Sequence, residues 1–432
     1  MRPAATPVAR GLLAAAVGVL WLTAWPSGAA AAEEVRLTMV SHLHSDFSSG
    51  WVPSMEAAAR RAEAEGVDVL ICTDHLLRRV EYGLWPARRW LRQEVRLNAV
   101  LERGVEAYLA QIALANQRHP RVLLLPGFEV VPFYYWSGSP LGGLTLHAWH
   151  QHLLIAGLTD PAVIRALPVT SNPFRPSPFD PYHGDQGARP YQAFIEACRE
   201  AGGLVFWAHP WGGVDDQVLR GVRVAAGPYF EQLADTDHYT GFEYGDLEVY
   251  GSKTLGRAEV WDQLLMDYCR GRRSSPVWVI ADTSMPNALA DKRTVLWAAA
   301  RTPEAVLAAL RAGRMYAVVR PPMPMVLETC RVRDLAGGAE GTLGETVRGR
   351  GPMAVRVRVG PVDPRRPAAF MLSVIRDGAV MARIGGEAPW EGQVVEDPGT
   401  PGARTYYRVE IEDAAGARIV ANPIFAHFTD QE

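Results

Sequence analysis

Two hydrophobic patterns alternate over the first three quarters of the chain. Short apolar runs of strand length end in polar residues, as in "VDVLICTDH" (67–75), "RVLLLPGFEV" (121–130) and "LVFWAHP" (204–210). Between such runs lie segments with apolar positions three and four residues apart, for example 54–66 and 190–203. Strands that alternate with helices indicate a parallel α/β architecture.

The same patterns predict the remaining elements of this part. Further strands are expected at 36–41, 151–158, 242–250 and 277–284, and further helices at 97–117, 257–271 and 302–314. The last helix has Thr302 in the N-cap position and Gly313 near its end. Segments 133–150 and 168–190 interrupt the alternation and are rich in aromatic residues, Gly and Pro. Loops of this length form the walls or lids of sites, or decorate the surface.

After about residue 320 the hydrophobic period changes to two. Stretches such as "MAVRVRVG" and "TYYRVEIEDAAGARIV" alternate apolar and polar residues, and "RDGA" and "DAAGA" supply turns. We therefore predict a small all-β sandwich over residues 321–432, after a barrel-like domain over 33–320. The linking stretch "VVRPPMPMVLE" leaves few flexible residues, so we expect a compact interface between the two parts.

The N-terminus has the pattern of an export signal. Two arginines precede an apolar stretch at 11–25, which is shorter than a membrane span, and "PSGAAAAEE" follows. Its small residues fit cleavage after Ala32, so residues 1–32 are predicted to be a signal peptide. The mature protein is then periplasmic or extracellular, with no stable membrane anchor. A buried helix or an uncleaved anchor is the alternative.

Composition narrows the classes of protein. The chain has 432 residues, of which 48% are hydrophobic, so a sizeable core is available. The net charge is −3 and no basic tract stands out, which argues against a nucleic-acid partner. The four cysteines are far apart and lack CxxC spacing, which favours buried thiols. The chain also lacks a GxSxG elbow and a Walker-type loop.

Potential metal ligands recur where the predicted strands end or begin. In "SHLHSDFSSG" (41–50), two histidines lie two apart on an extended segment and therefore point to the same side. The complete set is His42, His44, His75, Glu129, His152, His209 and Asp282. A lone strand-end histidine is more often structural, but a series along successive strands converges on one face of an α/β barrel. Imidazole and carboxylate ligands suit zinc, manganese or iron. His147 and His150 crowd His152 but lie in the preceding loop.

These motifs carry a resemblance to a known family. "HLHSDFSSG", "CTDH", "PGFEV", "QHLLIAGL", "FWAHP" and "VIADTS" resemble, in order and spacing, the motifs of the polymerase-and-histidinol-phosphatase (PHP) domain family, over roughly residues 36–320. The region after it resembles the C-terminal domain of secreted PHP-type hydrolases, including the carbaryl-hydrolase-like branch. The resemblance implies a distorted seven-stranded β/α barrel, a cluster of two or three metal ions, and hydrolysis, most often of phosphoesters.

The family pattern also implies a distribution of ligands. The first ion would be held by His42, His44, Glu129 and Asp282, and the second by Glu129, His152 and His209. The third would need His75 and the positions of Ser49 and Ser284, where the family has stronger ligands. A neutral hydroxyl is a poor ligand beside imidazole or carboxylate. We therefore expect two divalent ions, with His75 beside the centre or in contact with substrate.

The expected function is hydrolysis by a metal-activated water, with Glu129 and Asp282 at the metals. Asp46 is a candidate proton shuttle or replacement ligand, or else a turn cap. Arg78 and Arg79 would hold an anionic small-molecule ester, or else begin a solvated helix. A phosphoesterase is favoured. Hydrolysis of carboxylesters, carbamates or amides and a metal-binding module without catalysis are the alternatives. Trp211 and the aromatics at 133–136 would suit an apolar substrate.

Overall fold

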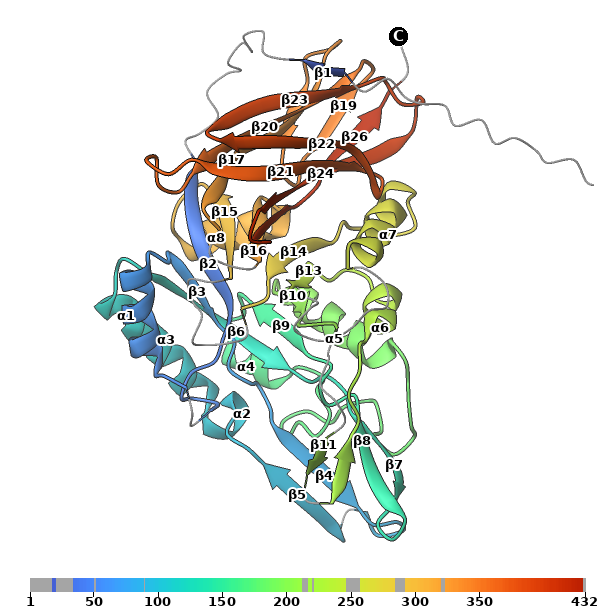
Figure 1. Ribbon diagram of the computed structural model, residues 1–432. Coiled ribbons are helices and arrows are strands. Elements are labelled where there is room, and N and C mark those ends of the chain that lie inside the picture. The colour runs from blue at the N-terminus through green and yellow to red at the C-terminus, as the bar shows by residue number, and fades with distance from the viewer. Residues whose placement is uncertain are drawn as a thin grey trace, which may run out of the picture.

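The computed structural model describes residues 18–20, 34–49, 52–88, 90–211, 217–219, 221–245, 257–283, 292–319 and 323–429. It has a mixed α/β part followed by an all-β C-terminal region (Figure 1). The strands that position the site are β2 (Val35–Leu43), β3 (Val69–Cys72), β6 (Leu123–Val130), β9 (Leu153–Ala156), β10 (Leu204–Trp207), β13 (Gly241–Tyr244) and β14 (Trp278–Ala281). They are neighbours in one sheet, in the order β14-β13-β10-β9-β6-β3-β2.

Helices lie to the left and to the right of this curved sheet in the view of Figure 1. They are α1 (Met55–Glu65), α2 (Val100–Arg103), α3 (Val105–Arg118), α4 (Pro161–Arg165), α5 (Arg189–Glu200), α6 (Phe230–Asp235), α7 (Arg257–Cys269) and α8 (Pro303–Ala312). The expected caps of α8 are present, since Thr302 Oγ1 accepts from the N–H of Ala305 and Gly313 is left-handed. The single helix expected over 97–117 is instead α2 and α3, because Gly104 has φ 104° and interrupts the helical backbone.

The prediction of a purely parallel sheet is wrong at one strand. β2, β3 and β6 run parallel to one another, as do β10, β13 and β14. β9 pairs antiparallel with both β6 and β10. No crossover helix separates β6 from β9 along the chain, and without a crossover the next strand can return in the opposite direction.

The seven strands curve so that β14 approaches β2, but the described strands form no ladder between the two. Side chains bridge them instead. Ser41 Oγ donates to the carbonyl of Ala281 at 3.0 Å, and the N–H of His42 donates to Thr283 Oγ1 at 2.8 Å. We refer to this contact as the seam. The fold is therefore α/β with a curved mixed sheet, and the expected closed barrel is not seen in the part described.

Two small β units lie at the end of the molecule farthest from the C-terminal region (Figure 1). One is the hairpin of β4 (Arg79–Gly83) and β5 (Arg92–Arg96). The other is a four-stranded sheet, in the order β11 (Gln217–Leu219), β12 (Val222–Val224), β8 (Gly143–His147) and β7 (Tyr135–Ser139). The segment 133–150, expected to be a loop, thus contains a hairpin. Gly138 and Gly143 have positive φ at its turn, so their roles there require glycine.

The C-terminal region consists of two packed sheets. β15 (Arg293–Ala298) and β16 (Met315–Val319) extend the large sheet into β25 (Arg418–Ala421), β24 (Arg404–Asp413), β21 (Ala368–Arg376) and β22 (Ala379–Ala388). β23 (Trp390–Glu396), β20 (Met353–Pro361), β17 (Met325–Asp334) and β18 (Glu340–Thr342) form the second sheet, and β19 (Thr346–Gly349) pairs with β26 (Ile424–Phe428). Alternate residues of both sheets share one buried core. The ladder between β16 and β25 joins this region directly to the α/β part.

A buried ion pair reinforces that contact. Asp262 on α7 accepts from Arg408 of β24 at 2.7 and 2.8 Å, one bond to each carboxylate oxygen. Tyr406 Oη also donates to Asp262 at 2.7 Å. The expected compact interface is therefore present.

Most of the predicted signal peptide lies outside the described residues. The exception is β1 (Gly18–Leu20), which pairs antiparallel with β23. Among the described helices, none is both long and apolar enough to cross a membrane.

Candidate metal centre

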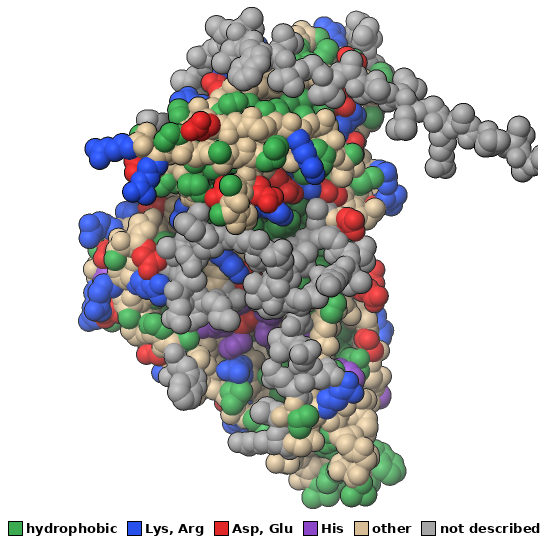
Figure 2. All heavy atoms as spheres, in the orientation of Figure 1, with side chains coloured by type: hydrophobic (Ala, Val, Ile, Leu, Met, Phe, Trp, Pro, Cys, Tyr) green, Lys and Arg blue, Asp and Glu red, His purple; other side chains and the backbone are tan. Residues whose placement is uncertain are grey.

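The carboxylate of Glu129 lies at the centre of a cluster of histidines. Its Oε1 is 2.5 Å from His152 Nδ1, 3.4 Å from His209 Nε2 and 3.5 Å from His42 Nε2. Its Oε2 is 3.0 Å from His75 Nδ1 and 3.2 Å from His44 Nε2. The Glu129 side chain is 3% exposed, so its carboxylate contacts these imidazoles in place of water. Histidine side chains gather near acidic ones on the face shown in Figure 2.

The fold brings these side chains together at one edge of the curved sheet. His42 lies near the end of β2, Glu129 near the end of β6, and His209 two residues after β10. His75 follows β3 and forms an isolated parallel bridge with Glu129. His152 comes before its strand rather than after it. Because β9 runs antiparallel, its first residues lie at the edge where its parallel neighbours end.

Among the residues that the structure describes, three groups of His, Asp and Glu side chains have ligand atoms within 4.8 Å of one another. They are His42, His44 and Glu129; Glu129, His152 and His209; and His42, Glu243 and Asp282. The first two groups share Glu129, and its two oxygens face different histidines. A buried carboxylate shared by two groups of imidazoles could hold a metal ion. The donor set therefore fits divalent ions with a preference for nitrogen and oxygen.

Glu243 belongs to this cluster and was not identified from the sequence. Its Oε1 lies 3.0 Å from His42 Nδ1, while Nε2 of the same ring faces Glu129 and His44. Its Oε2 accepts the backbone N–H of His209 at 2.9 Å. His209 has φ 28°, a left-handed conformation uncommon for histidine, and this hydrogen bond helps to hold it. Glu243 thus orients one ligand ring and the backbone of a second ligand.

A signal for Glu243 exists in the sequence. It stands in "GFEY" (241–244), between Phe242 and Tyr244, in a strand whose residues are all buried. A carboxylate is rarely fully buried without a partner. An acidic residue inside an apolar strand therefore indicates a site, even though it lies before the strand end.

Asp282 is fully buried directly after β14. It groups with His42 and Glu243, whereas His44 lies outside that group. A Cβ on Gly245 would lie 2.8 Å from Asp282 Oδ2, so the chain approaches Asp282 closely at that glycine. The placement of Asp282 on the same ion as His44 stays a prediction, and Ser284 lies outside the described residues.

The turn after His44 is held by a neighbouring carboxylate. Asp74 accepts from Ser45 Oγ at 2.7 Å and from Ser48 Oγ at 2.6 Å, as well as from the N–H groups of both serines. Asp46 is exposed on this turn, and Ser49 is half-buried. Asp46 belongs to none of the three ligand groups. The role expected for Asp46 stays a prediction.

Burial and mutual charge set the ionisation of the cluster. Burial acts to raise the pKa of Glu129, but the facing His152, His75 and His42 hold it well below its usual value. Burial lowers the pKa of His75 to about 3 and also lowers the pKa of His152. These two rings are therefore neutral near pH 7, which is the form that binds metal.

The pKa values of His42 and His209, which lie near both Glu129 and Glu243, shift in the opposite direction. Burial acts to lower the pKa of His42, but Glu243 and Glu129 raise it well above its usual value. The pKa of His209 is raised against its burial, chiefly by Glu129. Burial raises the pKa of Glu243. Cations bound in this cluster would take the place of the protons on these rings.

The two arginines after His75 differ in surroundings. Arg79 begins strand β4 rather than a helix, and its guanidinium lies 2.9 Å from Glu94 and 3.7 Å from Glu81. That pairing holds the β4–β5 hairpin together. Arg78 is half-buried and lines an apolar cavity beside the cluster. Contact of either arginine with substrate stays a prediction.

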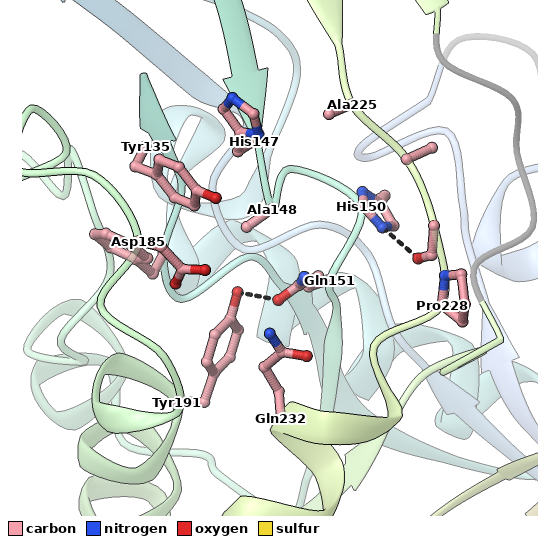
Figure 3. A pocket seen from close by; sticks show the side chains of 13 residues that line it. Tyr135, His147, Ala148, His150, Gln151, Asp185, Tyr191, Ala225, Pro228 and Gln232 are labelled. Carbon is pink, nitrogen blue, oxygen red and sulfur yellow. Dashed lines mark hydrogen bonds between the residues drawn. The ribbon is translucent and has the colours of Figure 1, made fainter. Parts of the chain in front are cut away.

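A second cavity, of about 160 Å³, adjoins the cluster and is polar (Figure 3). His150 and Gln151, the two residues before His152, lie on its wall. Tyr191 Oη donates to Gln151 Oε1 at 2.5 Å, and His150 Nε2 donates to the carbonyl of Gly227 at 2.7 Å. Trp211, which was considered as a substrate contact, is fully buried in the core.

Comparisons with known proteins add little. No protein-family model matches the chain, and no curated protein matches it. Among solved structures, an engineered protein is 21% identical over 26% of this chain and 22% of its own, with a TM-score of 0.15. The aligned part thus spans less than a quarter of that protein, and at this TM-score the similarity carries no argument. The resemblance to the PHP family therefore rests on the motifs of the sequence.

Proposed function

We propose that this protein is a metal-dependent hydrolase that uses an activated water. The observation that carries the proposal is Glu129, a buried carboxylate shared by two sets of histidine ligands. When bound, two divalent ions would lower the pKa of a water between them and polarise the bond that is attacked. This chemistry needs neither a serine nor a cysteine nucleophile.

The chain's own residues supply binding and orientation. His42, His44 and Glu129 would hold one ion, and Glu129, His152 and His209 the other. Zinc, manganese and iron each suit this donor set. Glu243 fixes the ring of His42 through Nδ1, so that Nε2 remains directed at Glu129. On the family resemblance we propose that the curved sheet is a distorted PHP-type barrel and that Asp282 completes the first set.

A phosphoester is the favoured substrate. Arg78 is a cation that lines a cavity beside the ligands, and its charge interacts with Glu129. A guanidinium in that place suits an anionic ester better than a neutral one. Hydrolysis of a carboxylester, carbamate or amide is the second candidate, supported by the apolar lining of the same cavity. The N-terminal pattern supports export of the protein.

An activity panel tests the proposal. The protein is loaded with Mn²⁺ or Zn²⁺ and assayed with p-nitrophenyl phosphate, bis(p-nitrophenyl) phosphate and 1-naphthyl acetate. We expect turnover of at least one phosphoester that is lost in Glu129→Gln and retained in Glu231→Gln, which makes the same change at an exposed position. Turnover of the naphthyl ester alone would select the second candidate. Tight metal binding with no turnover of any substrate would contradict hydrolysis and favour a binding module.

A further inference from the structure

A cavity of about 450 Å³ lies between the β4–β5 hairpin and the four-stranded sheet. The hairpin contributes Val80 and Val95 to its wall, and the sheet contributes Leu144, Leu146, Val222 and Val224. Arg78 is the charged residue of this lining. The volume falls within the range of pockets that enclose small organic molecules.

Alternation along the strands separates this cavity from the polar one. Val222 and Val224 line the apolar cavity, and Arg223 between them points to the opposite face. Trp136 on β7 likewise lines the apolar cavity, whereas its neighbour Tyr135 lines the polar cavity of Figure 3. The four-stranded sheet is thus a wall between two cavities of different chemistry.

The segment 148–151, just before His152, contributes to the walls of both cavities. Ala148 has φ 61°, which turns the chain after β8 and shifts the alternation by one residue. Trp149 consequently lines the apolar cavity, while His150 and Gln151 line the polar one. The carbonyl of Trp149 accepts from Nε2 of His152 at 3.1 Å. The wall of the apolar cavity is therefore hydrogen-bonded to a ligand ring.

Arg78 marks the end of the cavity that faces the cluster. It follows His75 by three residues, and His75 contacts Glu129. Of the apolar side chains beyond Arg78, Leu146 is buried, whereas Val80, Leu144, Val222 and Val224 are only partly buried although they pack against the buried cluster of Tyr134, Trp136 and Leu146. A concave apolar surface that ends at a cation beside metal ligands suits an amphiphilic molecule, with its anionic part at Arg78 and its apolar part in the cavity.

We propose that this cavity binds the apolar group of the substrate, an alkyl or aryl group joined to the anionic ester that the metal centre hydrolyses. The proposal rests on the proposed function for the position of the ester. It adds that selectivity arises at the hairpin and the four-stranded sheet. Binding energy from this non-reacting group would then help to place the reacting bond.

The test uses inert probes that share one head group. Methylphosphonate and hexylphosphonate are titrated calorimetrically into metal-loaded protein. Each methylene that enters the cavity should tighten binding about three- to fourfold. Hexylphosphonate has five more methylenes than methylphosphonate, so we expect it to bind about 240- to 1,000-fold more tightly when the whole chain enters the cavity.

Two variants place that effect in the cavity. Leu144→Trp should fill the space and remove most of the advantage of the longer chain. Val224→Thr should weaken hexylphosphonate about fivefold and leave methylphosphonate unchanged. The matched control is Val218→Thr on the same sheet. Val218 is 76% exposed and pairs with Arg223, so it faces away from the cavity and should change neither affinity.

The outcomes separate this proposal from the proposed function. Equal affinity for the two phosphonates, or a chain-length effect that survives in Leu144→Trp, would overturn the assignment of the cavity. A chain-length effect that Leu144→Trp removes, with no ester hydrolysed, would keep the cavity and reject hydrolysis. Hydrolysis of esters without any chain-length effect would keep the proposed hydrolysis and reject the role of the cavity.

Discussion

His42 Nδ1 and Glu243 Oε1 lie 3.0 Å apart in a fully buried pair, while Nε2 of the same imidazole faces Glu129. A histidine that offers one nitrogen to a cation usually gives the other to a carboxylate or carbonyl. In the group of His42, Glu243 and Asp282, the two nitrogens of His42 therefore have different roles. Glu243 orients His42, and the nitrogen directed at Glu129 is the one available to metal.

Glu243→Gln should weaken metal binding without unfolding the protein. Glutamine carries no charge and replaces one carboxylate oxygen with an NH2 donor, so it loses either the close contact with His42 Nδ1 or the acceptor for the N–H of His209. We expect a loss of about 10- to 100-fold in metal affinity, measured by competition with a chromogenic chelator. The control is Glu231→Gln, at an exposed position in α6, which should leave the metal affinity unchanged. An unchanged affinity in Glu243→Gln would show that Glu243 does not orient a ligand.

Two metal ions per chain are expected, with Glu129 common to both. Metal analysis after dialysis should give about two equivalents in the wild-type protein and close to none in Glu129→Ala. His44→Ala and His209→Ala should each lose one ion, because each belongs to a single ligand group. Three equivalents that resist dialysis would contradict the expected count.

Asp74→Ala should destabilise the turn that follows His44. The substitution leaves the buried hydroxyls of Ser45 and Ser48 and their N–H groups without their acceptor. We expect the free energy of unfolding to fall by about 2–4 kcal/mol, measured by urea denaturation. Asp235→Ala, an exposed position in α6, should change it by less than about 0.5 kcal/mol. A similar small change in Asp74→Ala would argue against the bracing role.

Asp262→Ala should weaken the contact between α7 and the C-terminal region. It leaves the buried guanidinium of Arg408 with Glu410 as its remaining ion-pair partner. Breaking a buried pair from one side costs about 3–5 kcal/mol. The double variant Asp262→Leu, Arg408→Met should be less destabilised than Asp262→Ala, since it removes both charges of the buried pair, and Glu410, which loses its contact with Arg408, is partly exposed to solvent. A double variant that is less stable than the single one would contradict this explanation.

Most side chains of the candidate metal centre could be predicted from the sequence, because strand ends leave a local pattern. An apolar run followed by histidine or carboxylate identifies His75, Glu129 and His209 without knowledge of the fold. Glu243 lies within its strand, and its role depends on where His42 is brought in space. That long-range relationship has no local signature beyond an acidic residue in an apolar run.

Strand direction and small hairpins were harder to predict. The direction of β9 depends on how the chain returns from the β7–β8 hairpin, and apolar runs look alike in both directions. The stretch around Arg79 has several charges and reads as a solvated helix start, but those charges pair across the β4–β5 hairpin. Cross-strand pairing of this kind is visible only when the partner strand is known.

A cation bound at the cluster would also stabilise the seam between β2 and β14. His42 on β2 and Asp282 after β14 belong to one ligand group, so the cluster lies across a junction that side chains close in place of a ladder. Side-chain bridges exchange with water more readily than a continuous ladder does. An ion held at this point would fasten the two edges. The seam amides of Ser41 and His42 should therefore exchange with deuterium much more slowly in the metal-loaded protein than in the metal-free one.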